Sequence, residues 1–77
     1  MEYLVVVFPA RREVLVDGVS HGFNQDLAGQ LRQLRVEEGL HRIRLRGPDD
    51  YVPLWQTCEV TGTNVNAPLH VAFDKKV

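Results

Sequence analysis

Apolar and polar residues alternate along several short stretches of the chain, and turn-forming residues separate these stretches. Val14 and Val16 share one face of the first alternating stretch, which ends at Asp17-Gly18, and residues 19–23 form the return strand. An Asp-Gly pair between apolar strands is typical of a type I′ turn, which requires positive φ at both central residues. The pattern therefore predicts a β-hairpin at Asp17-Gly18.

A second alternating stretch surrounds Glu38-Gly39. Leu34 and Val36 precede this turn on one face, and three residues follow it on the inward face of the return strand: His41, Ile43 and Leu45. The positions between them point to the opposite face and carry a row of arginines: Arg42, Arg44 and Arg46. In a hairpin, Arg35 on the partner strand joins this row across the turn. The pattern predicts such a hairpin.

Residues 2–8 form a continuous run of β-branched and aromatic residues. Such a run indicates a strand buried on both faces, either at the centre of a sheet or at an edge that a partner covers by strand addition. Further strands are predicted at residues 55–61 and 69–73. We therefore predict an all-β fold, a single small antiparallel β-sandwich of about six to seven short strands over residues 1–77, too short for parallel crossovers.

The stretch 25–33 is ambiguous. Leu27, Leu31 and Leu34 recur with helical spacing, and Asn24 is suited to cap a first turn. Gly29 lies within the stretch and disfavours helix by about 1 kcal/mol. A short helical turn around residues 25–33 and an irregular strand both remain open.

Composition narrows the class of protein. The 77 residues are 44% hydrophobic and 25% charged, and the net charge of −1 argues against a nucleic-acid-binding domain. The single cysteine, Cys58, excludes an intrachain disulfide and a multi-cysteine metal site. The longest apolar run is far shorter than the roughly 20 residues that span a bilayer, and no signal-peptide pattern occurs. We therefore expect no membrane span, and a cytoplasmic location if the chain is full length; the location of an excised domain stays open.

Two groups of residues are candidates for binding. The first is the row of arginines, whose planar guanidinium groups suit carboxylates and phosphates; its members are Arg35, Arg42, Arg44 and Arg46. The alternative is a solvated sheet face with glutamate partners. The second group is Tyr51 and Trp55, which flank Pro53 and could form a platform for a sugar or a peptide. The alternative is that these aromatic rings fill the core.

No combination of residues predicts catalysis. The three histidines, His21, His41 and His70, lack the spacing of metal ligands. Alternation places Cys58 on the same face as Val60, which indicates a buried and unreactive thiol. We therefore expect a protein that is not an enzyme, with no catalytic residue, no metal site and no cofactor.

The turns and their flanking strands resemble the PEGA domain. In that family a Val-x-Val-Asp-Gly hairpin precedes a Gly-x-His-x-Ile-x-Leu strand and a Gly/Tyr turn, and the matching residues here are Asp17, Gly18, Gly39, His41, Ile43, Leu45 and Tyr51. The chain lacks the tetrapeptide Pro-Glu-Gly-Ala, and its stretch between Gly22 and Gly39 is several residues longer than is usual in the family. The resemblance covers roughly residues 5–73. It implies a β-sandwich accessory module, often attached to surface, signalling or assembly proteins, with no catalytic residue.

These observations favour a non-catalytic interaction module that binds another protein or a second copy of itself. The alternative is a module that binds a glycan or an anionic polymer through the arginine-rich sheet face. Nucleic acid is disfavoured as a partner because the chain has no basic excess.

Overall fold

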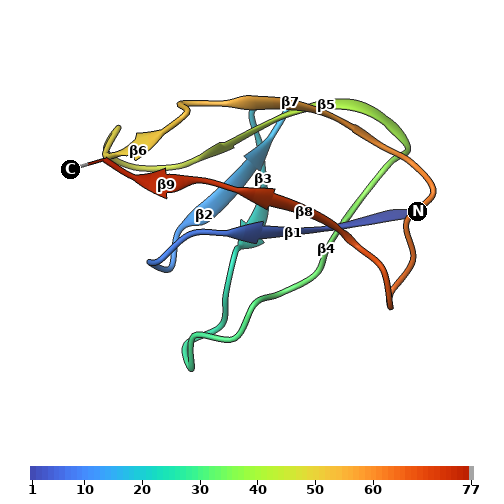
Figure 1. The fold of residues 1–77 in the computed structure, drawn as a ribbon, viewed down its shortest axis with the longest axis horizontal. Coiled ribbons are helices and arrows are strands. Elements are labelled where there is room, and N and C mark those ends of the chain that lie inside the picture. Colours follow the sequence, from blue (N-terminus) through green and yellow to red (C-terminus); the bar gives the residue numbers. More distant parts are fainter. Residues whose placement is uncertain (77) are drawn as a thin grey trace.

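The computed structural model describes residues 1–76, which form nine strands and no helix. One sheet has the order β4 (Leu34–Val36), β1 (Glu2–Val7), β8 (Leu69–Ala72), and the second has the order β3 (Val19–Phe23), β2 (Glu13–Val16), β5 (Gly39–Leu45), β7 (Gln56–Val60). A third, short pair, β6 (Tyr51–Val52) and β9 (Asp74–Lys75), lies at the end of the molecule opposite the N-terminus (Figure 1). The predicted small all-β sandwich is confirmed, and the two-residue strands β6 and β9 bring the number of strands above the prediction.

The core lies between the two larger sheets. Alternation turns one set of side chains inward along each strand, and these residues are almost completely buried: Leu4, Val6, Val14, Val16, Leu34, Val36, Ile43, Leu45, Val60 and Val71. Tyr51 and Phe73 close the core near β6 and β9, where their rings meet edge to face with 5.4 Å between centroids. The inward faces that the alternation predicted are thereby confirmed for these apolar residues, whereas His41, which was predicted to face inward with Ile43 and Leu45, is half-buried and outside the core.

The apolar strand β1 occupies the centre of its sheet, with β4 antiparallel on one side and β8 parallel on the other. Leu4, Val5 and Val6 are all buried. On the outer face, however, Tyr3 is half-buried and Val7 is 36% exposed, so the prediction of a strand buried on both faces holds only at the centre of β1. The other strand pairs of the described residues are antiparallel, as predicted, but the expectation that the chain is too short for a parallel crossover is wrong. Almost the whole chain lies between β1 and β8, and this connection is long enough to bring two parallel strands together.

The hairpin at Asp17-Gly18 is confirmed. β2 and β3 pair antiparallel up to Val16 and Val19, and the two turn residues have φ of 53° and 82°. Asp17 is the one non-glycine residue with positive φ in the described part of the chain. Aspartate tolerates this region because its short side chain forms local hydrogen bonds.

The predicted hairpin at Glu38-Gly39 is wrong. β4 pairs with β1, while β5 pairs with β2 and β7, so this turn carries the chain from one sheet to the other. Leu34 and Ile43 both face the core, but they do so from opposite sheets. Alternation specifies which residues face inward, and it is the same for two paired strands and for two strands on opposite sides of a sandwich.

The stretch 25–33 forms a loop, so the predicted helical turn is wrong. One carboxylate oxygen of Asp26 accepts hydrogen bonds from the backbone N–H groups of Ala28 and Gln30, both at 2.9 Å. Gly29 has φ of 84°, which is incompatible with a helix. Leu27 is 89% exposed and Leu31 49% exposed, so of the three regularly spaced leucines only Leu34, which lies in β4, faces the core. With no helix in the described residues, none is present that could cross a membrane.

Asn24 is a buried polar link between two chain segments rather than a helix cap. Its side-chain carbonyl accepts a hydrogen bond from the backbone N–H of Arg12 at 2.7 Å, and its amide donates to the carbonyl of Ala10 at 3.0 Å. The side chain therefore provides hydrogen-bond partners for backbone groups of the short turn 9–12, which no neighbouring strand pairs.

Candidate binding surface

The outward side chains of β5 form the most distinctive surface of the molecule. Arg42 and Arg44 are exposed on the outer face of the four-stranded sheet, as the alternation predicted. Within residues 1–76, no carboxylate oxygen lies within 4.0 Å of either guanidinium. Arg46 differs, because its guanidinium lies 3.3 Å from Glu13 Oε1. Two arginines of the row are therefore available to a ligand, and the third has an intramolecular partner.

Arg35 does not join this row. It lies on β4, which belongs to the other sheet and pairs with β1. Its predicted place beside Arg42 depended on the hairpin at Glu38-Gly39, which the fold does not contain.

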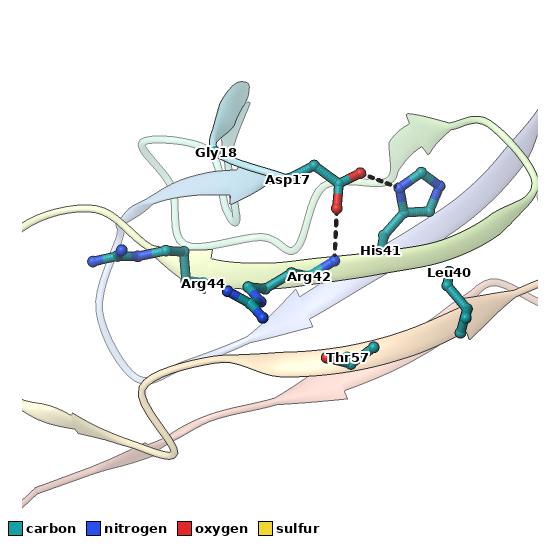
Figure 2. A pocket seen from close by; sticks show the side chains of 7 residues that line it. All are labelled: Asp17, Gly18, Leu40, His41, Arg42, Arg44 and Thr57. Carbon is teal, nitrogen blue, oxygen red and sulfur yellow. Dashed lines mark hydrogen bonds and ion pairs between the residues drawn. The ribbon is translucent and has the colours of Figure 1, made fainter.

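A shallow groove with a volume of about 560 Å³ follows β5 between the β2–β3 turn and β7 (Figure 2). The residues that line it are Asp17, Gly18, Leu40, His41, Arg42, Arg44 and Thr57. Leu40 belongs to this surface because it lies two residues before Arg42 on the same face of β5, and Thr57 because it is the partner of Arg42 on β7. The groove therefore combines two cations with an apolar side chain and a hydroxyl.

Asp17 and His41 form an ion pair at one side of the groove, joined by the dashed line in Figure 2. Oδ2 of Asp17 lies 2.6 Å from Nδ1 of His41, and Nε2 of His41 lies 2.6 Å from the carbonyl oxygen of Glu37. Because both neighbours of the imidazole accept hydrogen bonds, the ring is stabilised when it carries two N–H groups and a positive charge. The Asp17 carboxylate, followed by the Glu37 carbonyl, therefore raises the pKa of His41.

The second oxygen of Asp17 accepts a hydrogen bond from the backbone N–H of Arg42 at 2.9 Å. This bond, followed by the one to His41, lowers the pKa of Asp17. Both oxygens of the Asp17 carboxylate are thus occupied by backbone and imidazole. The carboxylate holds the turn against β5 through the backbone of Arg42, and it does not contact the guanidinium of that residue.

Trp55 lies beside Arg42 at the surface. Its side chain is 52% exposed, and the guanidinium carbon of Arg42 lies 5.5 Å from its ring centroid, a cation–π contact. Leu40, farther along β5, is 68% exposed. Of the two alternatives for Trp55, the structure therefore has the exposed one, and Arg42 has an exposed apolar side chain on each side, Leu40 along β5 and Trp55 across from it.

Tyr51 is a core residue and not part of a surface platform. It is completely buried, and its hydroxyl donates to the carbonyl of Leu45 at 2.8 Å and accepts from the N–H of Leu45 at 3.2 Å. The pairing of β5 with β7 ends at Ile43 and Gln56, so the hydroxyl takes the place of a further β7 residue. Tyr51 and Trp55 are thus separated by burial, although they lie close together in the sequence.

The remaining candidates have ordinary structural surroundings. Cys58 is half-buried, and burial raises the pKa of its thiol, which disfavours the nucleophilic thiolate. His70 is exposed. Among the residues that the structure describes, no three His, Cys, Asp or Glu side chains come together in a group that could hold a metal ion.

Five residues that line the groove were not identified as binding residues from the sequence: Asp17, Gly18, Leu40, His41 and Thr57. Leu40 is on the same face as the arginines by simple alternation, a signal that was present in the pattern. To predict the place of Thr57, the register of β5 against β7 must be known, and to predict the hydrogen bonds of Asp17, the pairing of β2 with β5 must be known. Register between strands is a tertiary property, and the residues alone do not specify it.

No protein-family model matches the chain, and neither a curated protein nor a solved structure matches it significantly.

Proposed function

We propose that this chain is a non-catalytic accessory module that binds another protein through the outer face of β5 and β7. The observation that supports the proposal is the pair Arg42 and Arg44, which have no carboxylate partner in the described residues. Two exposed apolar side chains lie near them, because Leu40 is on the same face of β5 and Trp55 contacts Arg42. Tryptophan and arginine are the residues most enriched at the energetic centres of protein interfaces. The resemblance to the PEGA domain supports the same class of function.

A glycan-binding module is the second candidate, and the exposure of Trp55 is the observation that favours it. The Arg42 guanidinium lies over the indole, however, and a sugar that stacked on that side of the ring would have to displace it. A glycan array tests this candidate. Binding that is lost in Trp55→Ala and retained in an Arg42→Ala, Arg44→Ala double variant would favour the glycan over the protein partner.

Site-directed photo-crosslinking tests the protein-binding proposal. A photoreactive residue is placed either at Thr57, in the groove, or at His70, which is exposed on the three-stranded sheet. We expect one protein to be captured from the native host at position 57, to be lost in an Arg42→Glu, Arg44→Glu variant, and to bind when both proteins are purified. Equal capture at the two positions, or purified binding that does not respond to the charge reversal, would contradict the proposal.

A further inference from the structure

The unpaired arginines of β5 have a geometry that defines the chemistry of a partner. Arg42 and Arg44 are two residues apart on one strand, so their side chains leave the backbone about 6.8 Å apart on the same face. An extended peptide has the same repeat. Two acidic side chains separated by one residue on such a peptide therefore match the two guanidinium groups, whereas two adjacent acidic side chains point to opposite sides.

We infer that the groove on β5 binds an extended acidic peptide segment of the partner, with the pattern apolar-x-acid-x-acid aligned on Leu40, Arg42 and Arg44. This inference rests on the proposed function and names the partner chemistry. Each guanidinium can hold a carboxylate through two parallel hydrogen bonds. Leu40, which is 68% exposed, offers the contact for the apolar residue.

The charges around the groove favour a short acidic segment over a long polyanion. Beyond these two arginines, the outer face carries Arg46, which is paired with Glu13, and two further carboxylates. These are Asp17 at the β2–β3 turn and Glu59, the exposed partner of Leu40 on β7. Nucleic acid and sulfated polymers need a continuous basic track. Two arginines between carboxylates instead select for a ligand with few charges in a defined register.

The fluorescence of Trp55 gives a local readout, since it is the one tryptophan in the chain and lies against Arg42. The probe is the blocked peptide Leu-Thr-Glu-Thr-Glu-Thr, and its matched control, Leu-Thr-Thr-Glu-Glu-Thr, has the same composition with adjacent glutamates. We expect the probe to bind at least about fivefold more tightly than the control, and its binding to weaken between about 50 and 200 mM salt because exposed ion pairs are screened.

Paired variants identify the surface. Arg42→Ala with Arg44→Ala removes the two groove cations, and Arg32→Ala with Arg35→Ala removes two exposed arginines outside the groove. The first pair should weaken the probe by about tenfold or more, the effect of losing roughly 1.4 kcal/mol. The second pair lowers the net charge equally and should change the affinity less than twofold. All four side chains are exposed, and unchanged thermal melts verify that the variants fold.

Several results would overturn the inference. Equal binding of the two peptides would show that the spacing of the acidic residues does not matter. Equal weakening by both pairs of variants would show that the peptide responds to net charge and not to Arg42 and Arg44. Tighter binding of heparin or oligo-dT than of the probe would assign the face to a polyanion. A dimer in light scattering that the Arg42/Arg44 variant dissociates would assign it to a second copy of the chain. Suppose that a partner is captured at Thr57 only when both arginines are present, while the probe peptide does not bind. In that case the acidic peptide pattern is wrong and the proposed function stands.

Discussion

Removal of one buried oxygen atom, by Tyr51→Phe, tests how this small sandwich completes its second sheet. The hydroxyl of Tyr51 accepts from the N–H of Leu45 and donates to the carbonyl of the same residue, at a position where β7 has ended. Phenylalanine keeps the ring and its edge-to-face contacts with Phe8 and Phe73, at 6.0 and 5.4 Å between centroids. The substitution therefore isolates the hydrogen bonds.

The expected loss follows from burial. Tyr51 is completely buried, so no water replaces the hydroxyl, and a buried N–H left without an acceptor costs about 1–3 kcal/mol. For a domain of this size, 1 kcal/mol shifts the melting temperature by about 4–8 °C. We therefore expect a melting temperature lower by about 5–20 °C, measured by circular dichroism, with a matching fall in the free energy of unfolding in urea.

Tyr3→Phe is the matched control. Tyr3 is half-buried, and its hydroxyl makes no hydrogen bond to any other described residue. Its removal should change stability by less than about 0.5 kcal/mol. Equal stability of wild type and Tyr51→Phe would refute the role of the hydroxyl. If the Tyr51→Phe protein is still folded but no longer binds the peptide, Tyr51 contributes to binding and its assignment as a core residue alone is wrong.

Two further predictions concern polar groups. Asn24→Ala removes the partners of two partly buried backbone groups, at Ala10 and Arg12, and should destabilise the fold by about 1–3 kcal/mol in urea unfolding; a loss under about 0.5 kcal/mol would contradict the assignment. The raised pKa of His41 predicts stabilisation that is complete below its unfolded pKa of about 6.5 and is lost as pH rises through the folded value. Asp17→Asn should flatten this dependence in urea midpoints measured from about pH 6 to 9, and an unchanged slope would exclude the ion pair as its source.

The local elements of this fold were predictable from the sequence, and their assembly was not. The Asp17-Gly18 hairpin and the outward row on β5 follow from turn chemistry and alternation, which act within a few residues. The parallel pairing of β1 with β8 joins the two ends of the chain. On its other side β1 pairs with β4, and this pairing places Arg35 in the sheet opposite β5.

The different burial of the two aromatic candidates, Tyr51 and Trp55, also depends on how the strands assemble. Tyr51 fills the end of the core and satisfies Leu45, whereas Trp55 precedes β7 at the surface. Arg12 shows what local patterns miss altogether. Its guanidinium donates to the carbonyls of Arg46 and Pro48 and pairs with Asp50 at 2.9 Å, contacts that span more than thirty residues. This pairing lowers the pKa of Asp50.

The central claim is that a partner binds the outer face of β5 and β7, and amide chemical-shift mapping tests it most directly. The ¹⁵N-labelled chain is titrated with the unlabelled partner recovered by crosslinking. We predict the largest shifts at Leu40, Arg42, Arg44 and Thr57, with little change on the three-stranded sheet. Shifts concentrated at Val7 and His70 of that sheet, with none around Arg42, would contradict it.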